Sequence, residues 1–206
     1  MKSNRLLAPL VLSLAAGCGG AQQTDAETPP PAGAQAEKAP RPGGSEPARG
    51  DVRTSDVDED GQPEVTKYYE KIDDPERKGQ RKSVLVRQEL DLTWDGRPDI
   101  WRYFAPDGKV TKEEWDLDYD GNVDETRYFE SGVIVRSERD HDNDGRIDVV
   151  RYYSDGKLER KETDSNGDGN ADRWEYFEGQ VLDRIGVDKD HDGTVDTWAK
   201  AATQRS

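Results

Sequence analysis

Six acidic nonapeptides recur along the chain, and each carries carboxylates at the spacing of a cation-binding loop. They follow the pattern Asp-x-Asp-x-Asp-Gly-x-x-Asp and occupy residues 56–64, 91–99, 116–124, 140–148, 164–172 and 188–196. Side chains at positions 1, 3 and 5 converge when the backbone turns tightly, and glycine at position 6 permits that turn. Hard oxygen ligands favour calcium and exclude zinc as the first choice. The chemistry that this spacing indicates is therefore Ca²⁺ binding, once per loop.

Four loops keep the pattern closely. Their candidate ligands at positions 1, 3 and 5 are Asp116, Asp118, Asp120, Asp140, Asp142, Asp144, Asp164, Asn166, Asp168, Asp188, Asp190 and Asp192. The alternative is that Asp, Asn and Gly serve only as turn residues. Four loops with the same acidic positions favour the metal site over that alternative.

Two earlier loops are degraded copies. Their candidate ligands at positions 1, 3 and 5 are Asp56, Asp58, Asp60, Asp91 and Asp95. Loop 91–99 has Thr93 at position 3 and Pro98 at position 8, so we expect it to bind weakly. Loop 56–64 has Pro63 at position 8 and should be intermediate.

The loops resemble known calcium loops by pattern. The first half is similar to an EF-hand loop, but position 12 holds residues such as Arg127 and Arg151 where an EF-hand needs glutamate. The calcium loops of FG-GAP propeller repeats are closer, and thrombospondin type 3 and dockerin loops share the core. The FG-GAP resemblance implies a further acidic ligand at position 9, which is Glu64, Asp99, Asp124, Asp148, Asp172 or Asp196 in the six loops. One repeat, such as residues 116–139, is too short for a four-stranded propeller blade.

The residues between the loops predict β-hairpins. In the repeat 116–139, residues 125–129 favour a strand, residues 130–132 contain a glycine turn, and residues 133–138 favour a second strand. The last five loops follow one another at an almost constant interval, so the same hairpin repeats. The sequence predicts an all-β fold, an antiparallel hairpin array or meander of about eleven short strands. The hairpins weakly resemble MORN-type and YwqK-like repeats.

Strand alternation predicts an aromatic face. Tyr68, Tyr103, Tyr128, Tyr152 and Tyr176 share one repeat position, and Thr66, Trp101, Thr126, Val150, Trp174 and Trp198 lie two residues earlier. We interpret this stripe as the core side of a sheet, with a sugar-stacking platform as the alternative.

A three-residue turn would pair Tyr128 with Ile134 and Tyr152 with Leu158, adding both aliphatic residues to the aromatic face. Arg151 would then oppose Glu159. Four glutamates lie two residues before their loops and are expected to be solvated strand ends: Glu89, Glu114, Glu138 and Glu162.

Residues 1–18 resemble a bacterial lipoprotein signal. Lys2 and Arg5 precede a short apolar run that ends in Leu-Ala-Ala-Gly-Cys, and the resemblance implies lipidation of Cys18 and anchoring at the cell envelope. Gly19 after the cysteine favours the outer membrane, on either its periplasmic or its surface side. Residues 19–55 are rich in proline and lack aromatic residues, which is typical of a disordered tether. Residues 56–206 form the repeat region.

The net charge of −15 disfavours nucleic acid as a partner. The only histidines, His141 and His191, lie within acidic loops and are expected to face solvent. No nucleophile stands in a recognisable motif, so we expect no enzyme. The sequence favours a lipid-anchored, calcium-binding structural or adhesion module whose partner is a protein or a polysaccharide. A calcium-responsive envelope accessory or immunity-like protein, or a metal-free β-repeat scaffold, remains an alternative.

Overall fold

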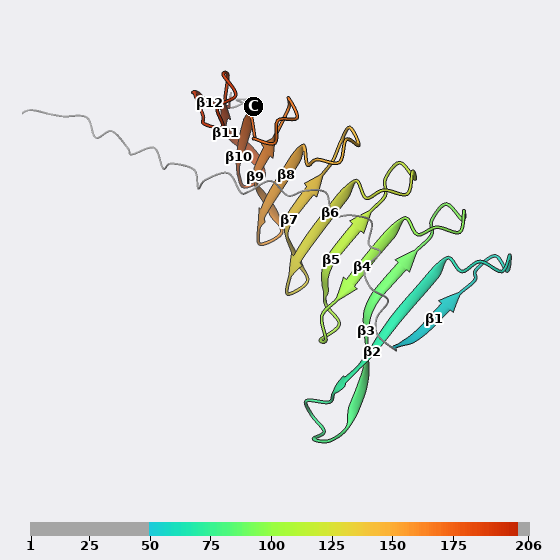
Figure 1. Cartoon of the computed structure of the whole chain (residues 1–206). Coiled ribbons are helices and arrows are strands. Elements are labelled where there is room, and N and C mark those ends of the chain that lie inside the picture. Colours follow the sequence, from blue (N-terminus) through green and yellow to red (C-terminus); the bar gives the residue numbers. More distant parts are fainter. Residues whose placement is uncertain (1–49, 202–206) are drawn as a thin grey trace, which may run out of the picture. The chain divides into compact units, whose positions relative to one another are not determined.

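The computed structural model describes residues 50–201, which fold into one antiparallel sheet (Figure 1). Its twelve strands are β1 (Asp51–Ser55), β2 (Val65–Asp73), β3 (Arg81–Leu90), β4 (Ile100–Phe104), β5 (Val110–Trp115), β6 (Glu125–Glu130), β7 (Val133–Arg139), β8 (Val149–Ser154), β9 (Lys157–Thr163), β10 (Arg173–Glu178), β11 (Val181–Val187) and β12 (Thr197–Lys200). Each strand pairs only with its neighbours in the chain. The expected all-β array of antiparallel hairpins is confirmed.

The sheet begins before the first acidic loop. β1 pairs with β2, with Asp51 opposite Tyr69 and Ser55 opposite Val65. These residues lie within the range 19–55 that the composition assigns to the tether, and they bring the strand count to twelve. Their sequence carries no hairpin signal of its own, so pairing with β2 is what makes them a strand. The lipoprotein signal, Cys18 and the tether up to residue 49 lie outside the described residues.

The sheet is a single layer, because residues 50–201 contain no helix and no second sheet that could cover either face. Only four apolar side chains in this range are buried: Ile100, Trp101, Val123 and Trp174. Buried acidic side chains outnumber them. The tyrosines of the aromatic stripe are half-buried by neighbours on their own face. Trp101 and Trp174 of the stripe are two of the four buried apolar side chains, although no second layer among residues 50–201 covers this face.

Each hairpin carries a bulge, which lies beside the turn in all of them except the longer hairpin β2–β3. Between β6 and β7, Ser131 and Gly132 have φ of 53° and 84°, as a two-residue type I′ turn requires. The register then shifts between Tyr128, opposite Arg136, and Phe129, opposite Ile134. The same shift occurs in the hairpins β2–β3, β4–β5, β8–β9 and β10–β11. The bulge is therefore common to all five hairpins, whereas the connection is longer in β2–β3 and β4–β5.

Because of the bulge, Ile134 and Leu158 lie on a different face of the sheet from the one expected. Ile134 and Leu158 lie opposite Phe129 and Tyr153, not opposite Tyr128 and Tyr152. The turn has two residues rather than three. One extra residue is inserted in the second strand, so the residues between the bulge and the turn change face. The aliphatic residues therefore join the face opposite the tyrosines. The expected pair of Arg151 with Glu159 is also wrong, since Arg151 lies opposite Lys161.

The other face carries what we call the tyrosine row, an alternation of aromatic and cationic side chains across the sheet. Successive partners are Tyr68, Arg87, Tyr103, Lys112, Tyr128, Arg136, Tyr152, Arg160, Tyr176 and Arg184. Lys112 Nζ lies 4.3 Å from the ring centroid of Tyr103, and Arg160 Cζ lies 4.1 Å from that of Tyr152. Such cation–π contacts contribute about 0.5–1 kcal/mol each. The common face predicted for the tyrosines is confirmed.

Glutamates two residues after the first four of the five cations join this row. The Tyr128 hydroxyl donates to Glu138 at 3.0 Å, and Glu138 is 5% exposed. Equivalent bonds join Tyr68 to Glu89, Tyr103 to Glu114 and Tyr152 to Glu162. The expectation that these glutamates are solvated strand ends is wrong, because the tyrosine and the cation enclose the carboxylate between them.

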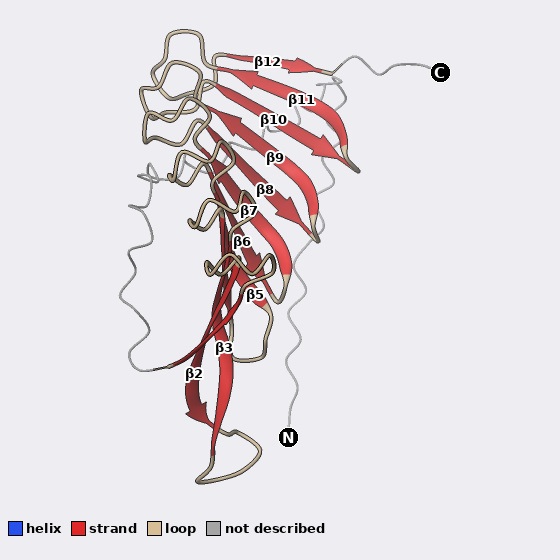
Figure 2. Cartoon of the chain, turned by 90° about the vertical axis from the view of Figure 1, so that its right-hand side faces the viewer, coloured by secondary structure: helices blue, strands red, loops and turns tan. Residues whose placement is uncertain are grey.

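The acidic loops gather along one side of the sheet, at the strand ends opposite the hairpin turns (Figure 2). This follows from the meander, in which loops and turns alternate. The hairpin β2–β3 is longer than the others and projects beyond the remaining turns (Figure 2). The repeat thus places every acidic loop in one line.

Candidate metal centre

All six acidic loops share one backbone conformation. The residues at position 4 have φ between 61° and 73°: Glu59, Trp94, Tyr119, Asn143, Gly167 and His191. The glycines at position 6 have φ between 85° and 94°: Gly61, Gly96, Gly121, Gly145, Gly169 and Gly193. Left-handed backbone strains most residues other than glycine and asparagine. Because unlike residues adopt it at position 4, the shared aspartates and glycine determine the loop shape.

The aspartate at position 1 holds the turn together. In loop 91–99, Asp91 Oδ1 accepts the N–H of Trp94 at 2.6 Å and Oδ2 accepts that of Gly96 at 2.7 Å. The bond from the position 6 glycine recurs in all six loops at 2.7–3.0 Å. Position 1 is buried in every loop except 56–64. This aspartate therefore organises the backbone whether or not it also binds a cation.

The acid at position 9 closes the loop from its other end. Asp124 Oδ2 accepts the N–H of Leu117 at 2.6 Å, and Asp148 Oδ2 accepts that of His141 at 2.6 Å. The remaining oxygen, Asp124 Oδ1, is buried and accepts no hydrogen bond from any described residue. A buried carboxylate oxygen without a donor is costly. A bound cation would satisfy it.

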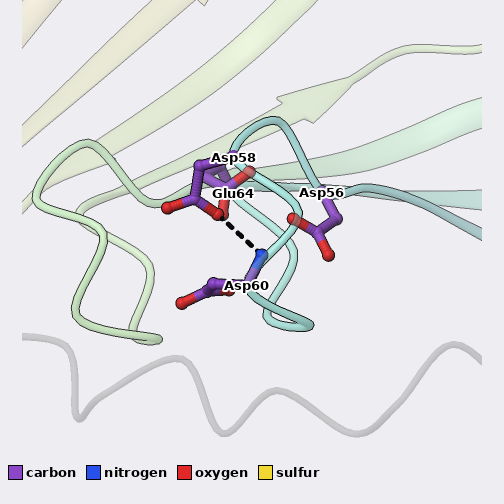
Figure 3. A group of neighbouring side chains, drawn as sticks. All are labelled: Asp56, Asp58, Asp60 and Glu64. Carbon is purple, nitrogen blue, oxygen red and sulfur yellow. Dashed lines mark hydrogen bonds between the residues drawn. The ribbon is translucent and has the colours of Figure 1, made fainter.

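Acidic side chains converge in four of the loops within the described residues. The groups are Asp56, Asp58, Asp60 and Glu64; Asp116, Asp118 and Asp124; Asp140, Asp142 and Asp148; and Asp188, Asp190 and Asp196. In each group, one ligand atom per residue lies within 4.8 Å of the others. Figure 3 shows the first group, in which the Asp60 N–H donates to Asp58 Oδ1 at 3.1 Å. These acidic clusters could hold a metal ion.

Electrostatic repulsion accompanies this convergence. Burial raises the pKa of Asp116, and the Asp124 and Asp120 carboxylates raise it further against the bonds from Gly121 and Tyr119. The Asp192 and Asp196 carboxylates raise the pKa of the exposed Asp190. The charged forms of Asp116 and Asp190 are therefore disfavoured, whereas backbone hydrogen bonds such as that from Gly193 lower the pKa of Asp188 against its burial.

The position 5 aspartates lie outside three of the clusters. Asp120, Asp144 and Asp192 each accept the N–H of the residue at position 7 at 2.7–2.8 Å, as Asp60 also does at 2.7 Å. Only Asp60, in loop 56–64, joins its group. The predicted set of positions 1, 3, 5 and 9 thus converges fully in one loop, while positions 1, 3 and 9 converge in three others.

Loop 91–99 brings no group of three acids together. Position 3 is Thr93, whose hydroxyl donates weakly to Asp91 at 3.4 Å. Arg97 pairs with Asp95 at 2.5 Å, and this hydrogen-bonded pair lowers the pKa of Asp95. Asp99 accepts the N–H groups of both Leu92 and Thr93. The Arg97 guanidinium therefore neutralises part of the negative charge that a metal ion would otherwise neutralise.

Loop 164–172 holds a histidine from the next loop. His191 Nδ1 lies 2.6 Å from Asp172 Oδ1 and 2.7 Å from Asn166 Nδ2. Asp164 and Asp168 also belong to this loop, and their carboxylates accept N–H groups of its backbone. His191 is exposed, as expected, with 47% of its side-chain surface accessible, and its ring also contacts Asp172 of the preceding loop. Its place at position 4 of a left-handed turn directs the ring towards the preceding loop.

Contacts between loops are a general feature that the sequence did not reveal. Asn143 Nδ2, at position 4, donates to Asp118 Oδ2 of the preceding loop at 2.5 Å. The N–H of Asp140 donates to the carbonyl of Asp124 at 2.9 Å, and the equivalent bond joins every pair of neighbouring loops. The only signal in the sequence is that Asn143 and Asp118 lie about one repeat apart. This spacing indicates a contact only when neighbouring loops are known to lie side by side.

Among residues 50–201, no helix is long and apolar enough to cross a membrane. This range forms strands, turns and loops alone.

Comparison with known proteins identifies no family. No family model and no curated protein matches the sequence. Two solved structures share limited similarity: accessory secretory protein 1, 2 and 3 in Streptococcus pneumoniae, at 16% identity, and the Glycosylation Associate Protein (Gap123) complex from Streptococcus agalactiae, at 14%. Each has a TM-score of 0.29; the matches cover 58% and 66% of this chain but 19% and 21% of those chains. The chain spans about a fifth of each, and these similarities carry no functional argument.

Proposed function

We propose that this chain is a lipid-anchored, calcium-binding repeat protein of the cell envelope. In this proposal the acidic clusters bind Ca²⁺, and the ions stabilise the row of loops at one side of the sheet. The protein acts as a structural or adhesion module, with no catalytic role. Cys18 carries the lipid, and the anchoring membrane is the outer membrane.

One observation carries the metal part of this proposal. In loop 116–124, Asp116, Asp118 and Asp124 offer oxygen atoms within 4.8 Å of one another, and Asp124 Oδ1 is buried without a hydrogen-bond donor. Calcium binds oxygens at about 2.3–2.6 Å, so two ligands on opposite sides of one ion lie about 5 Å apart. The separation within the cluster fits that geometry.

Calcium is favoured over other metals by the ligand set. The four clusters contain carboxylates only, with no cysteine or histidine. Magnesium requires a nearly ideal octahedron with short bonds, whereas calcium accepts irregular shells that include carbonyls and water. Sites with three side-chain ligands should bind in the range of about 10⁻⁴–10⁻³ M that is typical of extracellular modules. An envelope protein exposed to environmental calcium would fill such sites.

The partner is proposed from the remaining surface. The sheet faces carry charged and half-buried aromatic residues, and exposed apolar side chains such as Trp94 and Tyr119 lie in the loops. A protein or polysaccharide partner fits such a surface, because aromatic and charged groups can stack on sugars and form hydrogen bonds.

The test is a matched pair of charge-removing variants in the full chain. Asp142→Asn changes position 3 of a clustered loop, whereas Asp155→Asn changes an exposed aspartate in a hairpin turn at the opposite strand ends. Asp155 has φ of 49°, a conformation that asparagine tolerates. Both variants remove one negative charge and keep the side-chain volume.

Calorimetric titration with calcium then distinguishes the loss of a metal ligand from the loss of one negative charge elsewhere on the protein. Asp142→Asn keeps an oxygen at position 3, as Asn166 does in loop 164–172, but loses its charge, so one site should bind calcium more weakly. Asp155→Asn should bind calcium as the unaltered chain does. Equal affinities in the unaltered chain and both variants would show that Asp142 does not bind calcium and would overturn the site assignment.

A further inference from the structure

The two edge strands of the sheet are halves of different hairpins. In the repeat, the strand after an acidic loop pairs with the strand before the next loop, as β6 pairs with β7. β12 follows the last loop, 188–196, and has no following strand in the described residues. β1 precedes the first loop, 56–64, and has no preceding strand there. Within residues 50–201, one edge therefore lacks the second strand of a hairpin, and the other edge lacks the first.

The unpaired backbone groups at both edges lie at known residues. The N–H of Ala201 donates to the carbonyl of Asp183 at 2.7 Å, so the alternate residues Thr197 and Ala199 also face β11. The backbone groups of Trp198 and Lys200 therefore point away from the sheet. These are the groups that pair with β7 at the corresponding positions of β6.

The same reasoning applies to β1. The N–H of Asp91 donates to the carbonyl of Glu64 at 2.8 Å, which assigns the even residues of β2 to the bonds with β3 and the odd ones to the bonds with β1. With Arg53 opposite Lys67, the backbone groups of Arg53 and Ser55 face β2. Those of Val52 and Thr54 point outward. Each edge thus offers an open hydrogen-bonding row to a further strand.

The edge side chains are exposed where the repeat normally buries them. Trp101 and Trp174, each flanked by strands on both sides, are 8% and 4% exposed. Trp198 holds the same repeat position on β12 and is 41% exposed. Val52 on β1 is 54% exposed and lies on the same face, because it pairs with Tyr68 of the tyrosine row. Both edges therefore present apolar surface on one common face.

We propose that the two edges pair between copies of this chain, β12 of one copy antiparallel to β1 of the next. Applying the β6–β7 register places Trp198 opposite Thr54 and Ala199 opposite Arg53. This interface continues the antiparallel strand pairing of the sheet. It also places Trp198 and Thr54 on the face that carries the tyrosine row. The contact is between unlike surfaces, so it leaves a free edge on each copy and generates an open head-to-tail row. The pairing rests on the backbone register and not on the proposed metal sites.

The backbone contact between neighbouring loops agrees with this register. The pairing brings loop 188–196 of one copy beside loop 56–64 of the next, with the Asp56 N–H facing the carbonyl of Asp196. That bond is the one that joins each pair of neighbouring loops within the chain. Arg53 would lie beside the acidic loop end of the other copy.

Cross-linking between single-cysteine chains tests the register. In full chains that carry Cys18→Ser, Arg53→Cys is mixed with Ala199→Cys and oxidised gently. The control mixture pairs Thr54→Cys with Ala199→Cys, which shifts the register by one residue and places the two thiols on opposite faces. The first mixture should give about tenfold more cross-linked heterodimer than the control, because directly opposite residues meet disulfide geometry. Each single variant alone serves as the measure of random homodimers.

A second variant keeps the test decisive if a cysteine variant folds poorly. Thr54→Pro removes an outward N–H without removing a bond to β2. Sedimentation should show concentration-dependent association of the Cys18→Ser chain and its loss in the Cys18→Ser chain with Thr54→Pro, while circular dichroism of the two stays the same. Equal heterodimer yields in both mixtures, an absence of heterodimer at the highest soluble concentration, or unchanged association of Thr54→Pro would each overturn the proposal.

Discussion

The hydroxyl of Tyr128 donates a hydrogen bond of 3.0 Å to Glu138 Oε2, and Arg136 pairs with Oε1 of the same carboxylate at 2.5 Å. The guanidinium carbon of Arg136 also lies 5.8 Å from the Tyr128 ring centroid. A buried carboxylate is stable only when its oxygens are compensated. These three residues compensate one another on the surface of a single-layer sheet, where no second layer is present among residues 50–201. Repetition of the arrangement across the hairpins stabilises the platform that carries the acidic loops.

Removing the shared carboxylate should destabilise the sheet. Glu138→Ala leaves the Tyr128 hydroxyl and the partly exposed Arg136 without their partner, and a loss of about 2 kcal/mol in the free energy of unfolding is expected. Urea denaturation followed by circular dichroism measures this change. The control is Glu159→Ala, an exposed residue at the bulge of β9, with an expected change within about 0.5 kcal/mol. Equal effects of the two variants would contradict a structural role for the buried glutamate.

The tyrosine row should ionise late in alkali. Burial raises the pKa of Tyr128 to about 12, and the charge and hydrogen bond of Glu138 add to that rise. Burial and Glu114 likewise raise the pKa of Tyr103. The unfolded chain loses its tyrosine protons near pH 10, while folded Tyr128 keeps its proton. The stability that this residue contributes is therefore complete below about pH 10 and falls as the pH rises towards 12.

Ultraviolet absorbance of the phenolates measures this titration. The chain has eight tyrosines, so the expected curve has a first phase near the ordinary pKa and a second phase at higher pH. Glu138→Gln should move part of the second phase to lower pH. A single phase near pH 10 in the folded protein would contradict the buried Tyr–Glu pairs.

The contact between loops 164–172 and 188–196 should be detectable in the pKa of His191. The hydrogen bond to Asp172 raises the pKa of His191, and the Asp172 and Asp188 charges add to the rise. The protonated ring is favoured in the folded state, so its stabilising effect is present at low pH and is lost as the pH rises through the raised pKa. Proton NMR in chelator should show His191 titrating above the ordinary value of about 6.5. Asp172→Asn should lower that pKa, and an unchanged pKa would show that the two loops do not interact there.

The repeat made much of the fold predictable. Alternation in residues 125–129 and 133–138, with glycine between them, predicts the hairpin that became β6 and β7. The common face of Tyr128 and Tyr152 follows from a spacing that preserves strand parity within each repeat. These features are local, so one sequence is enough to predict them.

The bulge and the buried glutamates could not be predicted in the same way. Whether Ile134 lies opposite Tyr128 or Phe129 depends on one inserted residue, and neither Ser131-Gly132 nor the flanking strands reveals that insertion. Glu138 looks like a solvent-exposed residue at a strand end until the register places Tyr128 and Arg136 around it. Burial of a charge is a property of the pairing and is absent from the local pattern.

For the acidic loops, too, some features could be predicted from the sequence and others could not. The acidic pattern predicts the turn in all six copies, and the backbone conformation is indeed common to them. It does not reveal that Asp120 lies outside the cluster of Asp116, Asp118 and Asp124, or that His191 contacts loop 164–172. Those differences depend on the neighbouring loop, which lies one repeat away in the sequence and is adjacent in the sheet.

Calcium binding by the four acidic clusters is measured most directly by titrating the full chain with Ca²⁺ in a calorimeter and by melting it with and without chelator. About four ions per chain are expected, one for each cluster. At ten times the dissociation constant, each site adds about 1.4 kcal/mol to the free energy of unfolding, so the melting temperature should rise markedly with calcium. No heat of binding and an unchanged melting temperature at millimolar calcium would contradict the assignment of these loops as metal sites.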